Sequence, residues 1–205
     1  MESKKLVLIF TRNPELGKCK TRLAATIGDQ AALESYIFLL KHTVSITKGL
    51  CASKHVYYSE AVIEDDLWDT TIYSKYPQKG MNLGERMCNA FADGFEQGYE
   101  KIIIIGSDMY DLSQSDIEHA FDALESKNYV LGPAEDGGYY LFGMKSLNSQ
   151  VFKDKQWGTD TVLSTTLNDL KNETFTLLEE RNDIDYYEDI KDIDVFQKIL
   201  LKYND

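Results

Sequence analysis

Residues 6–23 have the sequence L-V-L-I-F-T-R-N-P-E-L-G-K-C-K-T-R-L. The first five of them, residues 6–10, form an unbroken apolar run, which is typical of a strand covered on both faces in a parallel sheet. Pro14 and Gly17 then interrupt regular structure, so a connection follows the strand. The stretch therefore predicts a central strand that ends in a loop.

Four cations lie on that connection, Arg12, Lys18, Lys20 and Arg22, although the whole chain has a formal net charge of −12. In open α/β sheets ligands bind at the carboxyl ends of the strands, where Lys, Arg and backbone N–H groups can hold phosphates. We therefore favour an anion site over the alternative of a solvated surface loop. The stretch matches neither a Walker A loop nor a G-x-G-x-x-G motif.

The length of 205 residues and the 43% apolar content predict one α/β domain over residues 1–205. The negative charge argues against nucleic-acid binding, which relies on a basic surface. No apolar run is long enough for a signal peptide or a spanning helix. We therefore expect no nucleic-acid partner and no membrane span.

The three cysteines, Cys19, Cys51 and Cys88, are few and widely spaced. Neither a disulfide framework nor a zinc site is expected, and a reducing cytoplasm fits best. Cations beside Cys19 would lower its thiol pKa, but no histidine has a sequence-level claim to act as its base. We interpret Cys19 as a spacer.

Beyond Arg22 the apolar spacing predicts a helix as far as about Lys48, with Gly49 placed to end it. Residues 55–59 and 70–76 have the composition of short strands. The acidic residues 64–66 between them are expected to form a solvated connection.

Residues 78–87, Q-K-G-M-N-L-G-E-R-M, predict a helix start with Asn82 as its N-cap. The apolar stripe of this helix is expected in the core and consists of Leu83, Met87, Ala90, Phe91 and Phe95. Gly84, Glu85 and Arg86 lie at the helix start, where they either read the edge of a ligand or serve plain capping.

A second buried strand is predicted from the four isoleucines at residues 102–105, and it leads to Asp108. Ser113 and Asp116 have the spacing of a capping box at the start of the next helix. This alternation of strands and helices predicts a parallel α/β sheet, with Asp108 at its ligand-binding edge.

The remaining chain contains a glycine-rich stretch at residues 132–143, G-P-A-E-D-G-G-Y-Y-L-F-G. Its glycines, proline and two acids around an aromatic pair are more than a hairpin needs, although a plain hairpin turn at Asp136-Gly137 is the alternative. Thr159 or Asp160 is expected near the N-terminus of a helix, a strand is expected around residues 174–178, and a closing helix carries Val195, Phe196, Ile199 and Leu200.

Several motifs follow one another in the order of a known family. They are P-x-x-G-x-x-K-T-R-L at residues 14–23, N-L-G-E-R-M at 82–87, G-S-D at 106–108, G-P-A-E-D-G-G-Y-Y-L at 132–141, W-G-T-D at 157–160, and D-I-D with E-D-I at 183–190. Over about residues 5–193 the chain resembles the bacterial radical-SAM/selenodomain-associated transferase 1 family, which is often described as glycosyltransferases. Tyr110 and the pair Tyr186-Tyr187 depart from the family pattern.

The resemblance implies the nucleotide-diphospho-sugar transferase fold, or GT-A fold: a central mixed, mostly parallel sheet between helices. It also implies that a nucleotide and a metal ion bind at the carboxyl ends of the strands. The K-T-R-L loop in addition looks like that of phospholactate guanylyltransferases, which transfer a nucleotidyl group from a nucleoside triphosphate. Transfer from an activated nucleotide calls for Mg²⁺ or Mn²⁺ on carboxylates and for Lys and Arg on the phosphates.

These expectations assign Lys20, Arg22 and Asp108 to catalysis. Asp108 is the favoured metal ligand, with Asp136 and Asp185 as weaker candidates. The residues expected to contact the nucleotide are Arg12, Gly17, Lys18, Lys20, Arg22, Asn82, Gly84, Glu85, Arg86, Ser107, Gly137 and Gly138.

The favoured hypothesis is nucleotidyl transfer from a nucleoside triphosphate to a small anionic or hydroxylated acceptor. The first alternative is glycosyl transfer from a nucleotide-sugar, although such enzymes usually carry D-x-D, whereas residues 106–108 offer only one acid. The second alternative is a nucleotide-binding module without turnover.

Overall fold

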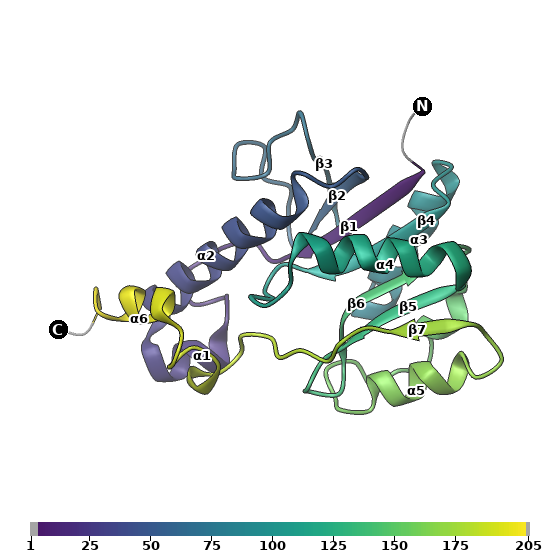
Figure 1. Ribbon diagram of the computed structural model, residues 1–205. Coiled ribbons are helices and arrows are strands. Elements are labelled where there is room, and N and C mark those ends of the chain that lie inside the picture. The colour runs from purple at the N-terminus through teal and green to yellow at the C-terminus, as the bar shows by residue number, and fades with distance from the viewer. Residues whose placement is uncertain (1–3, 204–205) are drawn as a thin grey trace.

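The computed structural model describes residues 4–203, and its centre is a seven-stranded sheet in the order β3-β2-β1-β4-β6-β5-β7 (Figure 1). The strands are β1 (Lys5–Thr11), β2 (Ser53–Tyr58), β3 (Ser74–Pro77), β4 (Lys101–Gly106), β5 (Tyr129–Pro133), β6 (Tyr139–Met144) and β7 (Phe175–Leu177). Only the pairings of β6, with β4 and β5, are antiparallel. The predicted mixed, mostly parallel sheet between helices is confirmed.

Helices lie on both faces of this sheet (Figure 1). The α-helices are α1 (Thr21–Ile27), α2 (Asp29–Thr47), α3 (Leu83–Glu96), α4 (Gln114–Ser126), α5 (Val162–Asp169) and α6 (Asp194–Leu200). Two 3₁₀ turns, η1 (Ser149–Phe152) and η2 (Tyr187–Asp189), complete the list. Within residues 4–203, no helix has the length and apolar character needed to span a bilayer.

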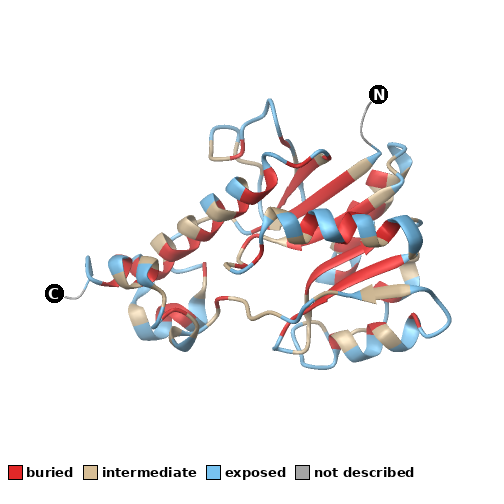
Figure 2. Cartoon of the chain, viewed as in Figure 1, coloured by how far each residue is buried: buried red, intermediate tan, exposed pale blue. Residues whose placement is uncertain are grey.

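The two central strands are buried on both faces because their side chains alternate between two hydrophobic clusters (Figure 2). Val7 and Ile9 of β1 belong to the cluster with α2 and α4, whereas Leu6 and Leu8 belong to the cluster with α3. The isoleucines of β4 divide in the same way. This double burial explains the continuous apolar runs in the sequence.

The strand directions bring the functional loops together. Every strand except β6 runs the same way, so the segments after β1, β4, β5 and β7 leave the sheet at one edge. The sheet order changes direction between β1 and β4, and crevices for ligands form at such a point. The loop with the cations and the loop with Asp108 therefore start on neighbouring strands.

Two expected element boundaries are wrong. The single helix to Lys48 is two helices, because Gly28 adopts φ 83° and breaks the helix between α1 and α2. The strand expected from residue 70 begins only at Ser74, because the Asp69 carboxylate accepts from Thr71 and holds a turn there. Helix α5 begins at Val162 with Thr161 as its N-cap, so Thr159 and Asp160 lie near its N-terminus, as expected.

Two expected environments also differ. Asp66, expected in a solvated connection, has a side chain only 14% exposed that accepts from Lys75 Nζ at 2.9 Å and Tyr58 Oη at 2.6 Å. Leu83, expected in the core, is 44% exposed. In contrast, the caps at Asn82 and at Ser113 with Asp116 are confirmed.

His55 of β2 is a buried titratable group with no charge partner in contact. It is 3% exposed, packs against the rings of Tyr76 and Tyr99, and its Nδ1 has no hydrogen-bond partner. Burial lowers the pKa of His55 from 6.5 to about 4, although Asp93 partly opposes the shift.

We predict that His55 makes folding stability depend on pH between 6.5 and 4. The unfolded chain binds the proton near pH 6.5 and the folded chain only near its pKa of about 4. The stabilisation is complete above pH 6.5, and up to about 3 kcal/mol is lost as the pH falls through this window. Urea unfolding at several pH values should show a flatter dependence for His55→Gln than for the wild type.

The control is His119→Gln, because His119 is exposed on α4. This variant should keep the pH dependence of the wild type. Equal slopes for His55→Gln and the wild type would contradict a buried, neutral His55.

Candidate active site

Two adjoining cavities lie at the edge where β1 and β4 end. The larger has a volume of about 750 Å³ and the smaller of about 250 Å³. Both are lined by Phe10, Leu83, Gly106, Asp108, Asp136, Gly158 and Asp183. The shared wall therefore carries three carboxylates.

The loop after β1 turns Lys20 into the larger cavity. Gly17 adopts φ 74°, and Lys20 itself has φ 48° and ψ 49°, a left-handed conformation rare for a residue with a side chain. Such a conformation costs about 1–3 kcal/mol and persists where surrounding contacts enforce it. Here the contacts are those of the Lys20 ammonium.

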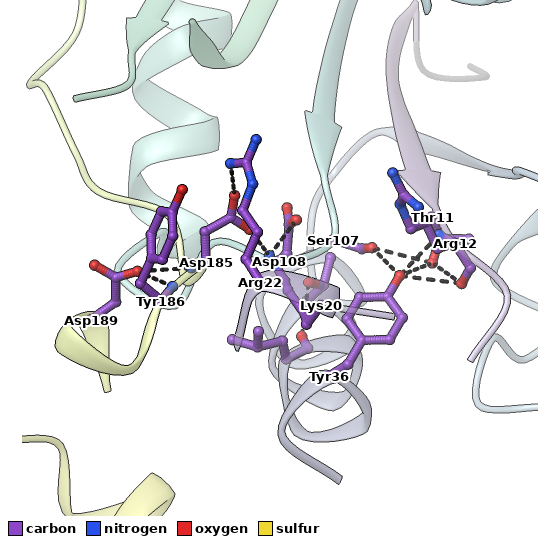
Figure 3. Close-up of polar contacts among 12 residues, drawn as sticks. Thr11, Arg12, Lys20, Arg22, Tyr36, Ser107, Asp108, Asp185, Tyr186 and Asp189 are labelled. Atoms are coloured by element: carbon purple, nitrogen blue, oxygen red, sulfur yellow. Dashed lines mark hydrogen bonds and ion pairs between the residues drawn. The ribbon is translucent and has the colours of Figure 1, made fainter. Parts of the chain in front are cut away.

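Lys20 Nζ lies between two carboxylates, 2.9 Å from Asp108 Oδ2 and 3.0 Å from Asp185 Oδ1 (Figure 3). The Lys20 side chain is only 5% exposed. Burial alone would lower its pKa, but the charges of Asp108 and Asp185 outweigh burial and raise the pKa of Lys20. The ammonium therefore stays charged and connects three segments that are distant in sequence.

Arg22 holds Asp185 from the other side. Its Nη1 lies 2.9 Å from Asp185 Oδ2, and its guanidinium lies 5.7 Å from the centre of the Tyr186 ring. Asp189 Oδ2 accepts from the backbone N–H groups of Asp185 and Tyr186 (Figure 3). The D-I-D-Y-Y-E-D segment is thus a folded turn that presents Asp185 to both cations.

A buried hydroxyl network joins the ends of β1 and β4. Tyr36 Oη accepts from the N–H of Arg12 at 2.9 Å and lies within 3.2 Å of Thr11 Oγ1 and 3.1 Å of Ser107 Oγ (Figure 3). Burial raises the pKa of Tyr36, so its hydroxyl stays protonated. This network positions the loops on which Lys20 and Asp108 lie.

Asp183 and Asp136 complete the acidic wall. Burial, followed by the charges of Asp108 and Asp185, raises the pKa of Asp183 to about 6, although Lys20 acts in the opposite direction. Asp136 Oδ1 accepts from the N–H of Gly138 at 2.8 Å, inside the hairpin turn between β5 and β6. The wall thus carries more acid than Lys20 alone balances.

Most residues expected at the site do gather there. The larger cavity is lined by Arg12, Lys18, Lys20, Arg22, Asn82, Arg86, Ser107, Asp108, Asp136 and Asp185, and Gly138 lines the smaller one. Gly17, Gly84, Glu85 and Gly137 line neither cavity. Gly84 and Gly137 instead allow close backbone approach, since an added Cβ would lie 2.6 Å from Trp157 Nε1 and 2.4 Å from Asp160 Cα, respectively.

The helix start at residues 82–86 has chiefly a capping role. Asn82 Oδ1 accepts from the N–H of Glu85, and Glu85 Oε2 accepts from the N–H of Met81. Arg86 donates to Gly80 O and Gln78 Oε1 while also lining the larger cavity. Of the two interpretations left open, capping therefore accounts for Asn82 and Glu85.

Cys19 has the environment of a structural residue. Its side chain is buried, Sγ donates to Asn13 O, and burial raises the thiol pKa despite the nearby cations Arg12 and Lys20. The structure agrees with its interpretation as a spacer.

Sequence reasoning missed several lining residues, chiefly Asp183, Gln78, Tyr36 and Trp157. For Asp183 a signal was present. In an extended segment residues i and i+2 lie on one side, and Ile184 between the two acids is buried. Trp157 lies in the W-G-T-D motif but was not assigned to the site, and nothing in the local sequence distinguishes Tyr36 from an ordinary core residue.

Comparison with protein families gives one match. The model of the family described as "Uncharacterized protein conserved in bacteria (DUF2064)" matches residues 43–159, more than half of the chain. The narrower family suggested by the sequence motifs stays a prediction. The search of curated proteins gave no match.

Solved structures share the fold over almost the whole chain. A protein from Desulfovibrio desulfuricans G20, provisionally named a nucleotide-diphospho-sugar transferase, has a TM-score of 0.86 at 26% identity, with 98% of both chains covered. The inositol-1-phosphate CTP transferase from T. maritima gives 0.54 at 13% identity, with 99% of this chain and 97% of that chain covered. The 4-diphosphocytidyl-2C-methyl-D-erythritol synthase from Anaerococcus prevotii DSM 20548 has a TM-score of 0.59 at 9% identity, with 95% of this chain and 97% of that chain covered. The two more distant likenesses show the fold alone.

We predict that Tyr36→Phe destabilises the protein by about 1–3 kcal/mol, because it leaves the buried groups of Arg12, Thr11 and Ser107 short of a partner. Urea unfolding measures the change. The matched control is Tyr139→Phe, because the buried Tyr139 hydroxyl has no hydrogen-bond partner. Removing the Tyr139 hydroxyl should cost nothing, and an equal loss in both variants would contradict a special role for the Tyr36 network.

Proposed function

We propose that this chain, which belongs to the DUF2064 family of proteins conserved in bacteria, transfers a nucleotidyl group from a nucleoside triphosphate to a small acceptor. One observation carries the proposal. Four cations of the loop after β1 and the carboxylate of Asp108 line a single cavity of about 750 Å³ in an acidic chain. Cations beside a carboxylate suit a ligand that combines phosphates with a positive counterion.

The likeness to nucleotidyl-transferring enzymes supports the same class of reaction. The T. maritima structure is a CTP transferase, and the Anaerococcus prevotii structure is a diphosphocytidyl synthase. Because these likenesses concern the fold, the type of reaction has to be inferred from the residues that line the cavity. Glycosyl transfer is the second candidate, supported by the name of the Desulfovibrio desulfuricans protein.

We assign the residues as follows. Lys20 and Arg22 bind the phosphates and neutralise the charge that develops on the leaving group, with Arg12 and Lys18 in support. Arg86, Asn82 and Gln78 lie on the same cavity wall and contact the remainder of the nucleotide.

The expected Mg²⁺ or Mn²⁺ fits the donor set. Asp108 and Asp185 each direct one carboxylate oxygen at a single cation, Lys20 Nζ. Mg²⁺ commonly takes one or two carboxylates together with substrate phosphates and water. In the described residues no three Asp, Glu, His or Cys side chains form a ready-made metal site. We therefore propose Asp108 and Asp185 as the ligands, and the ion would supply charge neutralisation on the phosphates.

We predict that nucleoside triphosphates raise the thermal stability of the protein through Lys20 and Arg22. A ligand at about 100 times its dissociation constant adds roughly 2.7 kcal/mol to the free energy of unfolding. The double variant Lys20→Ala, Arg22→Ala should lose this gain in a thermal-shift experiment. Lys41→Ala with Lys48→Ala is the control, because it removes the same charge from exposed positions on α2 and just after it, outside both cavities. An unchanged shift in the first double variant would remove this loop from the nucleotide site.

We also predict that turnover releases pyrophosphate and requires Mg²⁺ or Mn²⁺. Asp108→Asn keeps the shape of the side chain and removes its charge, so turnover should fall by about 10²–10³, the scale of one preorganised electrostatic contact. A coupled pyrophosphate assay over the common triphosphates and acceptor mixtures measures this. Release of a nucleoside diphosphate from a nucleotide-sugar would show glycosyl transfer instead. Activity that is indifferent to Asp108→Asn and to metal removal would contradict the assignment of Asp108.

A further inference from the structure

The smaller cavity differs in chemistry from the larger one it adjoins. Besides the shared wall it is lined mainly by apolar and aromatic residues: Met87, Met109, Tyr139, Tyr140, Trp157 and Val162. Its volume of about 250 Å³ lies just below the range of about 300–1,000 Å³ for drug-sized ligands, so it suits a compact ligand. The larger cavity, in contrast, has room for an entire nucleotide.

The walls of the smaller cavity are built by close contacts that keep it open. Trp157 packs against Gly84 of α3, where an added Cβ would lie 2.6 Å from Nε1. The Tyr140 ring covers Gly132 in the same manner, with an added Cβ 2.4 Å from its Cζ. The aromatic walls are thus held by neighbouring backbone, and the cavity is preformed.

The charges on the smaller cavity have one sign. Its lining includes the carboxylates of Asp108, Asp136 and Asp183 and, among the described residues, no Lys, Arg or His. Lys20 pairs with Asp108 from the side of the larger cavity, which leaves the other two acids without an ion pair in contact. A second anion placed here would lie close to these carboxylates and be repelled by them.

We propose that the smaller cavity binds the acceptor, and that this acceptor is an uncharged alcohol or phenol with a compact apolar body. The inference rests on the proposed nucleotidyl transfer. It narrows the class of acceptor, because the sequence allowed an anionic or a hydroxylated acceptor and the cavity favours the uncharged one. The apolar body packs against Trp157 and Met87, and the hydroxyl faces the shared wall.

The reaction that this arrangement supports is balanced. The acceptor hydroxyl oxygen forms a bond to the α-phosphorus of the triphosphate. The bond between that phosphorus and the oxygen bridging to the β-phosphate breaks, and pyrophosphate leaves with the electron pair. The hydroxyl proton passes to water in the open larger cavity. The product is a phosphodiester between the nucleoside monophosphate and the acceptor.

The nucleobase is the rival occupant of an aromatic cavity. The larger cavity provides the hydroxyls of Ser59 and Thr21, which can pair with a base edge close to the cations, whereas the amides of Gln78 and Asn82 already have partners in the protein. The smaller cavity has no comparable set of neutral polar side chains apart from Thr159 and the tyrosines. We therefore place the whole nucleotide in the larger cavity.

A pair of probes that differ only in charge tests the proposal directly. Ligand-observed NMR at pH 8 measures the dissociation constants of 4-(hydroxymethyl)benzamide and 4-(hydroxymethyl)benzoate, with benzyl alcohol as the simplest apolar probe. The amide should bind at least about tenfold more tightly than the carboxylate, and benzyl alcohol should bind as well. Equal binding of the pair, or tighter binding of the carboxylate, would overturn the proposal.

Variants locate the probes. Val162→Phe fills the smaller cavity and should weaken benzyl alcohol binding at least about tenfold, without changing the thermal shift given by nucleotides. Because Val162 is buried, Thr159→Tyr at the exposed rim serves as a second variant, and Thr165→Tyr, exposed on α5 and outside both cavities, is its matched control. Benzyl alcohol binding that survives both cavity variants, or nucleotide binding that is lost in Thr159→Tyr, would overturn the proposal.

These binding measurements need no turnover, so they test the ligand class of the smaller cavity separately from the proposed nucleotidyl transfer. Selective binding of the uncharged probes without pyrophosphate release from any triphosphate supports the cavity's ligand class and contradicts nucleotidyl transfer. Pyrophosphate release that requires only anionic acceptors supports nucleotidyl transfer and overturns this acceptor assignment.

Discussion

The contact of Lys20 with Asp108 and Asp185 is the interaction on which the site depends. The three residues follow β1, β4 and β7, and the ammonium, at 2.9 and 3.0 Å from the two carboxylates, joins them. A side chain 5% exposed could not carry this charge without partners, because desolvating an ammonium costs several kcal/mol. The pairing also accounts for the left-handed backbone of Lys20, since the turn at φ 48° directs the side chain inward.

The same contact explains the distribution of charge around the cavities. The wall shared by the two cavities carries the carboxylates of Asp108, Asp136 and Asp183, and in the described part of the chain only Asp108 of these forms an ion pair, so this wall keeps a negative excess. The pKa of Asp183, raised to about 6 by burial and by its acidic neighbours, reports this excess. A positive ion brought with a phosphate chain would relieve it, whereas a second anion in the smaller cavity would increase it. This distribution of charge agrees with the proposed division of the two cavities between two kinds of ligand.

Much of this arrangement could be predicted from sequence where the signals are local. Four isoleucines in a row predict a central strand, and cations after one strand with an acid after another predict a site at the edge where parallel strands end. The smaller cavity had no such signal, because its walls arise from contacts such as Trp157 on Gly84 that join distant segments. The helix break at Gly28 also had no signal in the sequence, because the apolar spacing continues across it from α1 to α2. Tertiary contacts decide these features.

The third hydrophobic cluster determines where the acids of the last segment point. Ile184 is buried with Leu23, Leu39 and Phe196, so the acids on either side of it, Asp183 and Asp185, lie away from that cluster and on the cavity wall. Tyr110, where the family pattern has another residue, packs between Phe38, His42 and Phe196 in this cluster. Its ring thereby helps to hold α6 against α2. Tyr110 thus supports the position of Asp185 through packing, and it lines neither cavity.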